Sequence, residues 1–428
     1  MRSFMRQYVI IGNSAAGIAA VEAIRQKDKE SKVIVISEEE YSAYCRCLIS
    51  YFLAGEVKEE KIFYRPENFY KDNNVELHLN KKVARVDPKK NRVICEDKTG
   101  FDYDSLLIAT GASPKFPENT KGIKKTGVYG FRTIKDAQTI SGQVPVVKAA
   151  CVLGGGLVGL KAAYALKKRG VDVKVIIRSA QVLSQMLDKE AAAVVQKVLE
   201  ENGIELYFGQ DVAEIIGDGE LRAVKLDSGK VFGCSLVIVG KGVAPNIGLI
   251  KDTQIKFNQG IIAAAKLETN IPNIYAAGDV CESFDLTMAR HAVNALWPVA
   301  VRQGKIAGTN MTGESVNYEG SLGMNAIEFF GLPVISLGVY RLKDADASVE
   351  ELKSFQPKDN LYKKFLIRDN VLIGALLVGN IKNSGVFLRL MREKINISNL
   401  KDKLLSDNFG YPDIMNLVSI REPDKVYI

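Results

Sequence analysis

The sequence predicts an α/β protein in which two similar parallel-sheet units are followed by a smaller α+β segment. Three observations support this prediction. A strand pattern runs into a glycine-containing turn at Gly12 and again at Gly154, 154 − 12 = 142 residues later. Each turn is followed by a helix pattern and a second strand pattern, as in a βαβ unit. Beyond about residue 319, strand patterns come one after another before two helix patterns. With 428 residues the chain can form two or three domains of the usual ~150 residues.

The composition is that of a globular protein, with 47% hydrophobic and 25% charged residues. No apolar run approaches the ~20 residues that a membrane-spanning helix needs, and the N-terminus leads directly into a strand pattern. We therefore expect a cytoplasmic protein without a membrane span. The formal charge of +8 favours anionic partners such as nucleotides or an acidic electron-carrier protein. Because this charge is not concentrated in a basic arm or helix, we expect no nucleic acid partner.

The first βαβ unit begins close to the N-terminus. Its strand, turn, helix and second strand are predicted at residues 7–11, 12–17, 17–26 and 32–37. Gly12 permits the tight turn after the strand, and Gly17 lets helix and strand pack closely. The helix N-terminus then presents its N–H groups to a pyrophosphate. Ser14 replaces the middle glycine of the motif and is small enough for a phosphate to approach. Glu38 ends the second strand, where a carboxylate can accept hydrogen bonds from a ribose.

The second unit carries the complete glycine motif. Its strand and turn are predicted at residues 150–153 and 154–159, a helix follows through residue 168, and the second strand is predicted at 171–177. Here Arg178 and Ser179 follow the second strand, and no carboxylate is available for a ribose hydroxyl. An arginine and a serine at this place can accommodate a 2′-phosphate, which favours NADPH over NADH, unless Arg178 is only a solvated surface charge. Two such Rossmann-like units in one chain are typical of proteins that hold two dinucleotides facing one another.

Four further segments resemble a known family in their order around the two glycine turns. They are Leu-Leu-Ile-Ala-Thr-Gly at 106–111, Val-Ile-Val-Gly-Lys-Gly-Val-Ala-Pro-Asn at 237–246, Asn-Ile-Tyr-Ala-Ala-Gly-Asp at 273–279 and Gln-Gly-Lys-Ile-Ala-Gly at 303–308. Over about residues 7 to 320 the chain is similar to the pyridine nucleotide-disulfide oxidoreductases, which are flavoproteins with two dinucleotide-binding domains. The resemblance implies three domains. They are an FAD-binding domain at 1–115 and 250–318, an NAD(P)-binding domain at 116–249, and a C-terminal domain at 319–428.

The resemblance also implies which residues bind the two cofactors. Asp279 would bind the ribityl chain of FAD and Glu38 the adenosine ribose, while Thr110 and Gly111 would line the flavin side. For Asp279 the alternative is a helix N-cap. The full set implied for FAD is Gly12, Ser14, Ala15, Ala16, Gly17, Glu38, Arg46, Thr110, Gly111, Gly278 and Asp279. The set implied for NADH or NADPH is Gly154, Gly156, Leu157, Val158, Gly159, Arg178, Ser179 and Gly242.

The last segment has the pattern of an α+β domain. Strands are predicted at 333–339, 364–367 and 372–378, and helices at 387–394 and 397–405. In the superfamily such a domain packs against a partner subunit, so the resemblance implies a homodimer. The stretch 372–379 is similar to the end of the flavin portion of nitrite-reductase large subunits and of NADH:rubredoxin oxidoreductases.

Six scattered cysteines are too few for a disulfide scaffold: Cys45, Cys47, Cys95, Cys151, Cys234 and Cys281. The glutathione-reductase-like branch carries two cysteines four residues apart, a spacing that this chain lacks. The segment 44–55 has two interpretations. Cys47 with the residues after it resembles the single-cysteine segment of coenzyme A disulfide and persulfide reductases, although Ser50 replaces their proline. The longer match is to the nitrite-, rubredoxin- and ferredoxin-reductase group. In that group Arg46 would contact FAD phosphates, the alternative being a solvent-facing salt bridge.

The role of Cys47 stays open at this point. As a thiolate beside an arginine and a flavin it could attack a disulfide or persulfide sulfur, and otherwise it is a small residue packed under the flavin. A disulfide between Cys45 and Cys47 is not expected, because side chains two apart on a strand diverge. Cys95, Cys151 and Cys234 lie in strand-like apolar runs and are predicted to be core. For Cys281 core packing is also favoured over an approach to the flavin.

Several substitutions relative to the family narrow the chemistry. NADH peroxidases carry a histidine in the first glycine turn where this chain has Ala15, which disfavours peroxide reduction by that route. His78 is predicted at the surface of a strand, and for His291 a structural role is favoured over a place at the flavin edge, so no metal or histidine site is expected. Lys161 and Tyr51 stand where ferredoxin-reductase-type members carry a glutamate and a lysine near flavin N5.

The predicted activity is therefore that of an FAD-dependent NAD(P)H oxidoreductase, in which the protein aligns the two rings and the flavin carries the chemistry. The expected acceptor is an electron-carrier protein such as rubredoxin. One alternative is a coenzyme A disulfide or persulfide reductase that uses Cys47. Another is a flavin subunit of a larger electron-transfer assembly.

Overall fold

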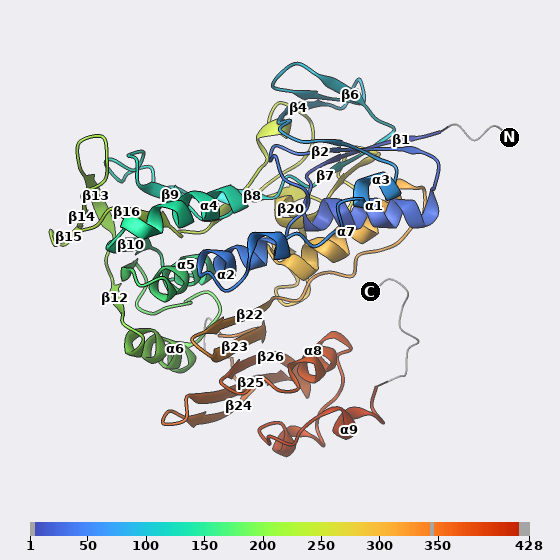
Figure 1. The fold of residues 1–428 in the computed structure, drawn as a ribbon. Coiled ribbons are helices and arrows are strands. Elements are labelled where there is room, and N and C mark those ends of the chain that lie inside the picture. Colours follow the sequence, from blue (N-terminus) through green and yellow to red (C-terminus); the bar gives the residue numbers. More distant parts are fainter. Residues whose placement is uncertain (1–4, 343–345, 419–428) are drawn as a thin grey trace.

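A computed structural model describes residues 5–342 and 346–418 (Figure 1). Its first body is a sheet of five parallel strands in the order β19-β7-β1-β2-β3. The strands are β1 Gln7–Ile11, β2 Lys32–Ile36, β3 Val75–His78, β7 Ser105–Ile108 and β19 Ile274–Ala276. Strand β19 comes from far along the chain and completes the sheet beside β7. Strands β1, β2, β7 and β19 are buried on both faces or nearly so, and they therefore read in the sequence as continuous apolar runs. The edge strand β3 is only partly buried.

Two long helices of this body pack closely against each other. They are α1 Ala15–Lys27 and α7 Trp297–Met311. A Cβ atom on Gly304 would lie 2.1 Å from the Ala16 carbonyl oxygen, and one on Gly308 would lie 2.6 Å from that of Ala20. Glycine at both places therefore sets the close approach of α7 to α1, and with it the position of the first glycine turn.

The second body is another sheet of five parallel strands, in the order β12-β11-β10-β16-β9. The strands are β9 Val128–Gly130, β10 Ala149–Leu153, β11 Asp172–Ile177, β12 Ile204–Phe208 and β16 Leu236–Val239. Its helices are α4 Ile134–Gln143, α5 Leu157–Lys168 and α6 Lys189–Glu201. A two-stranded ribbon of β8 Ala112–Pro114 and β17 Val243–Pro245 joins the two bodies where the chain crosses from one to the other and back.

Smaller elements complete these two bodies. Two three-stranded antiparallel sheets consist of β4 Val83–Asp87, β5 Arg92–Cys95 and β6 Gly100–Asp102, and of β13 Val212–Ile216, β14 Ala223–Leu226 and β15 Val231–Gly233. A third small sheet contains β18 Ile261–Ile262, β20 Cys281–Asp285 and β21 Arg290–Ala292. The short helices are α2 Ile49–Leu53 and α3 Phe69–Asp72, with 3-10 turns η1 Arg46–Leu48, η2 Glu59–Lys61, η3 Val144–Val146, η4 Gly248–Ile250 and η5 Gly278–Val280.

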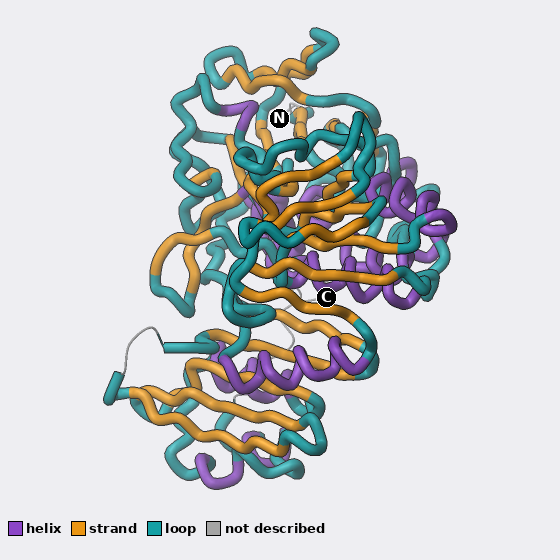
Figure 2. The backbone as a smooth tube through the Cα atoms, turned by 90° about the vertical axis from the view of Figure 1, so that its left-hand side faces the viewer, coloured by secondary structure: helices purple, strands orange, loops and turns teal. Residues whose placement is uncertain are grey.

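The C-terminal segment forms an antiparallel sheet at the foot of the molecule in both views (Figure 1, Figure 2). Its strands are β22 Met324–Phe329, β23 Leu332–Gly338, β24 Val349–Gln356, β25 Leu361–Arg368 and β26 Val371–Val378. One face joins the core of the second body, where α6 packs against the sheet. The other face is covered by α8 Ser384–Arg392 and by the residues that follow it, which include η6 Lys401–Lys403 and α9 Tyr411–Ile414.

The predicted fold class is confirmed, with two corrections in the C-terminal segment. The helix predicted at 397–405 is wrong. Ile397, Leu400 and Leu404 are buried at a helix-like spacing, but the backbone forms three-residue turns such as Leu400 N–H to Ile397 O at 2.9 Å. The edge strands β22 and β24 were not predicted, because their polar residues hide the strand pattern.

Some expectations stay predictions. They are the domain boundaries, the homodimer and the cytoplasmic location. The last ten residues of the predicted C-terminal domain, 419–428, lie outside the described residues. Within the described parts of the chain, no helix is both long and apolar enough to cross a membrane.

Candidate functional site

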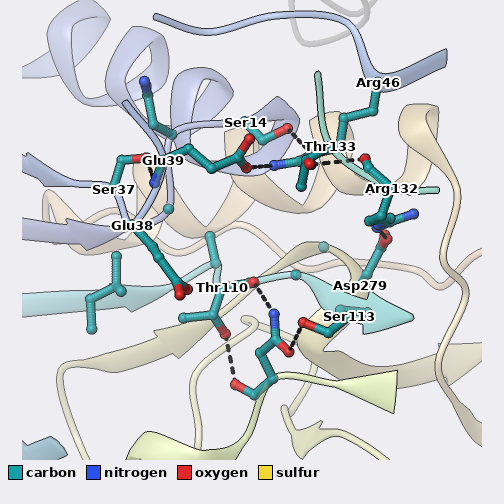
Figure 3. Close-up of a pocket in the computed structure, with 18 of the residues that line it drawn as sticks. Ser14, Ser37, Glu38, Glu39, Arg46, Thr110, Ser113, Arg132, Thr133 and Asp279 are labelled. Carbon is teal, nitrogen blue, oxygen red and sulfur yellow. Dashed lines mark hydrogen bonds and ion pairs between the residues drawn. The ribbon is translucent and has the colours of Figure 1, made fainter. Parts of the chain in front are cut away.

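A cavity of about 730 Å³ opens at the carboxyl ends of the first sheet's strands, where ligands of open α/β sheets bind. Segments far apart in the sequence contribute to its lining (Figure 3). All but one of the residues predicted for FAD line it, together with the predicted thiol: Gly12, Ser14, Ala15, Ala16, Glu38, Arg46, Cys47, Thr110, Gly111, Gly278 and Asp279. The exception, Gly17, lies one layer behind the lining residues, in the helix that carries the turn.

The first glycine turn has a geometry that side chains would obstruct. Gly12 has φ +122°, and a Cβ atom there would lie 2.1 Å from the Ala109 carbonyl oxygen. A Cβ atom on Gly17 would lie 1.9 Å from the carbonyl oxygen of Gly12. Ser14 is the extended residue directly before α1, so the first N–H groups of the helix point into the cavity. This cradle fits a pyrophosphate, which needs close backbone approach and unpaired N–H groups.

The second glycine turn repeats this geometry at the end of β10. Gly154 has φ +121°, and its Cβ atom would lie 2.4 Å from the Gly240 carbonyl oxygen. A Cβ atom on Gly159 would lie 2.1 Å from the oxygen of Gly154. A Cβ atom on Gly156 would meet nothing within 4 Å, which explains why Ser14 can occupy the equivalent place in the first turn. The two turns therefore have the same backbone geometry.

The residues predicted for the nicotinamide dinucleotide gather around this second turn. Leu157 and Val158 begin α5 and are half-buried. Arg178 is exposed directly after β11, and it has no hydrogen bond or ion pair to another described residue. The Ser179 hydroxyl donates to the Gln181 carbonyl oxygen at 2.8 Å. Gly242 is exposed with φ +90° at the start of β17. None of these residues is among the described residues that line the first cavity.

Two arginine–carboxylate pairs cross the first cavity (Figure 3). Arg46 pairs with Glu39, and its Nε atom donates to the Ser14 hydroxyl at 3.4 Å. The Arg46 side chain is 23% exposed, so it faces the glycine turn rather than bulk solvent. Arg132, which precedes α4, pairs with Asp279 at side-chain exposures of 21% and 13%. The N-cap alternative for Asp279 is wrong, because Asp279 lies inside η5.

Sequence reasoning missed several residues of this site, among them Glu39, Arg132 and Asn246. Arg132 stands just before the helix-capping Thr133, so a capping signal followed by α4 was the available clue. Asn246 ties the ribbon to the cavity: its side-chain amide donates to the Thr110 carbonyl oxygen at 2.9 Å, and its own carbonyl accepts from the Thr110 hydroxyl at 2.9 Å. The Ser113 hydroxyl completes this clip by donating to Asn246 Oδ1 at 2.8 Å. Asn246 ends the segment 237–246, which resembles the family, but no role was predicted for it.

Of the remaining cysteine and histidine candidates, Cys47 lines the cavity and the others lie elsewhere in the described structure. Cys47 is exposed and lines it, whereas the predicted core positions of the other cysteines apart from Cys45 are confirmed, the buried thiols being Cys95, Cys151, Cys234 and Cys281. His78 lies on β3 against Phe101, with ring centroids 4.7 Å apart. His291 is exposed on β21. The described residues contain no cluster of three or more His, Cys, Asp or Glu side chains that could hold a metal ion.

Lys161 and Tyr51 do meet, as their places in the family imply. The Lys161 ammonium lies 3.9 Å from the Tyr51 ring centroid and 4.3 Å from that of Tyr164, and it donates to the Glu328 carbonyl oxygen at 3.3 Å. Burial lowers the pKa of Lys161 to about 8, against the opposing charges of Glu56 and Glu328. In this chain the two positions therefore hold a lysine in contact with aromatic rings, and not a glutamate and a lysine of opposite charge.

Comparison with known proteins gives two family matches. Residues 6–304 match the model of the pyridine nucleotide-disulphide oxidoreductases, and residues 324–395 match the rubredoxin NAD+ reductase C-terminal domain. An NADH oxidase of Methanocaldococcus jannaschii is 35% identical over 81% of this chain and 76% of its own length. A nitrite reductase [NAD(P)H] of Bacillus subtilis is 31% identical over 92% of this chain. This chain spans only 48% of that enzyme.

A solved structure agrees with these matches. The NAD-dependent persulfide reductase of A. fulgidus superposes with a TM-score of 0.85 at 25% identity, over 92% of this chain and 78% of its own. The family matches together cover both parallel-sheet bodies and the C-terminal sheet. The chain belongs to the pyridine nucleotide-disulphide oxidoreductase family and is an FAD-dependent NAD(P)H oxidoreductase.

Proposed function

We propose that the chain passes electrons from NADPH or NADH through FAD to an electron-carrier protein such as rubredoxin. The observation that carries this proposal is a β-hairpin with exposed apolar side chains, which is connected at both ends to residues that line the cavity. A carrier protein must dock close to the flavin, and the hairpin offers a surface for that contact. The match of residues 324–395 to the rubredoxin NAD+ reductase C-terminal domain supports the same acceptor.

The chain's own residues would hold FAD along the cavity. The N–H groups at the start of α1 and the Arg46 guanidinium face the place of the pyrophosphate, and Glu38, 66% exposed at the end of β2, is available to a ribose. Asp279 would accept the ribityl hydroxyls while Arg132 fixes its carboxylate. Bound FAD supplies the redox chemistry, since it takes a hydride equivalent from the nicotinamide and releases electrons singly or in pairs. The hydrogen bonds of Asn246 with Thr110 hold together the two chain segments that connect the bodies. They would thereby help to align the two cofactors.

The hairpin consists of β20 and β21, and residues that line the cavity stand at both of its ends. Gly278 and Asp279 precede it, and Ala295 and Trp297 follow it. Its exposed apolar side chains are Phe284 at 39%, Leu286 at 36% and Met288 at 47%.

The turn of the hairpin is held by a buried carboxylate and carries an exposed arginine beside it. Asp285 is fully buried and accepts from the Met288 backbone N–H at 2.8 Å and from the Asn294 amide at 2.6 Å. Arg290 is exposed, and its guanidinium contacts the Met288 sulfur at 3.5 Å. An exposed apolar surface with an arginine beside it, on a chain of net charge +8, suits an acidic carrier.

The test is the substitution Met288→Glu. A carboxylate here would lower the rate of NAD(P)H-dependent rubredoxin reduction at limiting rubredoxin by about tenfold or more, because like charges oppose docking. The rate with ferricyanide, a small acceptor that needs no docking surface, should not change. Met415→Glu, at a 54% exposed methionine far along the chain in the C-terminal segment, is the matched control. Equal rubredoxin rates for both variants would show that the hairpin is not the docking surface.

We also propose that the second dinucleotide is NADPH. The exposed Arg178 guanidinium at the end of β11 has no partner among the described residues and is available to a 2′-phosphate, and Ser179 lies beside it. A turnover assay with both nucleotides decides this, since a strong preference for NADH would end the NADPH assignment.

A second candidate function is disulfide or persulfide reduction through Cys47. The observation that favours it is the exposure of this thiol in the lining of the cavity. The fold similarity to a persulfide reductase is consistent with it. Cys47→Ser assayed with coenzyme A disulfide and with rubredoxin separates the candidates. Unchanged activity on both acceptors would remove Cys47 from the mechanism, and loss with the disulfide alone would support the second function.

A further inference from the structure

The segment 178–188 joins the end of β11 to the start of α6 and lies against the second glycine turn. It begins with Arg178 and Ser179 and ends at Asp188, the N-cap residue of α6. Within it, the Leu183 N–H donates to the Gly155 carbonyl oxygen at 2.8 Å. Because Gly155 is part of the turn, the position of the segment and the position of the turn are fixed relative to each other.

Hydrogen bonds inside the segment connect its two ends. The Ser179 hydroxyl donates to the Gln181 carbonyl oxygen at 2.8 Å. The Gln181 side-chain amide in turn donates to the carbonyl oxygens of Leu187 at 3.1 Å and Asp188 at 3.3 Å. Leu183 has φ +49°, a conformation that leucine rarely adopts, so contacts with the surroundings must hold this shape. A shift of Asp188 would therefore be passed on to Ser179.

The C-terminal sheet holds the Asp188 end of the segment. The Tyr362 hydroxyl and the Lys364 ammonium, both on β25, donate to Asp188 Oδ2 at 2.7 Å and 3.0 Å. The other carboxylate oxygen accepts from the Ala191 N–H at 3.0 Å and caps α6. The Asp188 and Lys364 side chains are 13% and 10% exposed, and Tyr362 is fully buried. Water therefore weakens these charge-assisted bonds much less than it weakens a surface pair.

Two further observations support this attachment. Burial, followed by the hydrogen bond to Asp188, raises the pKa of Tyr362, so the phenol keeps its proton and donates it at neutral pH. Tyr340, which follows β23, donates to the Ser184 carbonyl oxygen at 3.4 Å. The C-terminal segment therefore contacts the segment 178–188 at two separate places.

We propose that Tyr362 and Lys364 of the C-terminal sheet are positioning residues for the nicotinamide dinucleotide. They act through Asp188, which holds the segment 178–188 where its first residues can contact the adenosine end of the nucleotide. The proposal rests on the proposed role of Arg178 and Ser179, and it gives the C-terminal sheet a part in nucleotide binding. The identity of the electron acceptor does not enter it.

Two substitutions break the attachment and keep the elements that it joins. In Asp188→Ser the serine still caps α6, but its shorter side chain does not reach β25. Lys364 is not left as an uncompensated buried charge, because it also pairs with Glu351 at 3.0 Å. Tyr362→Phe keeps the buried ring and removes only the hydroxyl.

The first measurement is steady-state turnover with ferricyanide as the acceptor. The adenosine end does not react, so its contacts are the same before and during hydride transfer, and their loss raises KM without lowering kcat. For the nucleotide that the unaltered chain prefers, we expect KM to rise about fivefold in Asp188→Ser and about threefold in Tyr362→Phe. The kcat should stay within about twofold in both.

Lys353→Met is the matched control. It removes the ion pair of Lys353 with Glu190 at 2.8 Å, which also joins the C-terminal sheet to α6 but is 44% and 40% exposed and does not involve Asp188. Because exposed pairs contribute little, KM should stay within about twofold. An unchanged KM in both Asp188→Ser and Tyr362→Phe would overturn the proposal. A rise in KM for Lys353→Met as large as that for Asp188→Ser, or a fall in kcat to match, would overturn it too.

A binding measurement without turnover gives a second readout. Calorimetric titration of the oxidised FAD-loaded proteins with NADP+ should show a Kd for Asp188→Ser that is raised by the same factor as KM, and an unchanged Kd would count against the proposal. A strong preference of the unaltered chain for NADH would instead end the NADPH assignment. In that case KM for NADH and titration with NAD+ test the same attachment, so the two failures are distinguishable.

Discussion

Replacing Lys161 with methionine tests the free-energy cost of burying the charge of this lysine. The side chain is 8% exposed, and its pKa of about 8 lies 10.5 − 8 = 2.5 below its ordinary value. At 1.36 kcal/mol per pKa unit, burial of the charge costs about 3 kcal/mol at pH 7. The contacts with the Tyr51 and Tyr164 rings return about 1 kcal/mol each. Methionine has a similar length without the charge, so Lys161→Met should stabilise the fold by about 1 kcal/mol at pH 7.

The pH dependence gives the sign of this effect independently. The folded pKa of Lys161 is lower than the unfolded value, so between about pH 8 and 10.5 the unfolded chain binds the proton that the folded chain has lost. Stability attributable to this group therefore rises with pH across that window, and the penalty is complete below it. Lys161→Met should lose the rise.

Urea unfolding of both proteins between pH 7 and 10.5, followed by circular dichroism, measures both effects. Lys168→Met, on the same helix at a 44% exposed lysine, is the control that should keep the rise. A Lys161→Met protein that is less stable at pH 7 by more than about 1 kcal/mol would refute the reasoning, because the aromatic contacts would then outweigh burial.

Three other outcomes are expected. Asp279→Asn should lower FAD content on dialysis, because an amide accepts ribityl hydroxyls less strongly than a carboxylate, and full retention of FAD would contradict the assigned role. Arg178→Ala should raise the KM for NADPH by about tenfold and leave that for NADH within about twofold; equal changes would identify Arg178 as a surface charge. Sedimentation velocity should show a homodimer at micromolar concentration, and a monomer there would count against it.

The two glycine turns were predictable because their requirement is a backbone one. A residue at Gly12 or Gly154 must adopt a positive φ and leave room for a carbonyl oxygen, and only glycine does both without strain. The buried parallel strands were equally readable, since burial on both faces produces continuous apolar runs. The repeat of strand, turn, helix and strand then fixed the order of the elements without any long-range information.

Features that depend on contacts between distant segments were not predictable. Arg132 and Asp279 are 147 residues apart, and nothing local to either one indicates the pair. The helix expected at 397–405 failed for a related reason: the Ile397 N–H donates to the Asn370 carbonyl oxygen at 2.8 Å, and this tertiary bond holds the start of the segment against the sheet. The spacing of the apolar residues predicted correctly which side chains are buried, but it did not predict the backbone conformation of the segment.

The turn at Cys45 shows a third kind of limit. The directions of two cysteine side chains one residue apart depend on whether the backbone between them is a strand or a turn. The sequence around Cys45 predicts neither conformation. Cys45 directly precedes η1, and its carbonyl oxygen accepts from the Leu48 N–H at 3.0 Å, so the two cysteines lie in a turn. The chemistry of this segment therefore depends on one local backbone conformation.

The most direct test of the whole account compares Gly17→Val with Gly159→Val. A Cβ atom at either place would lie about 2 Å from a carbonyl oxygen of its own glycine turn, at 1.9 Å and 2.1 Å respectively. The measurement is the FAD content of the purified proteins and the rate at which NAD(P)H bleaches the flavin. We predict that Gly17→Val loses FAD, whereas Gly159→Val keeps one FAD per chain and is bleached at least 100-fold more slowly than the unaltered protein at limiting nucleotide. A Gly159→Val protein bleached at the normal rate, or a Gly17→Val protein with full FAD, would contradict the assignment of one dinucleotide to each turn.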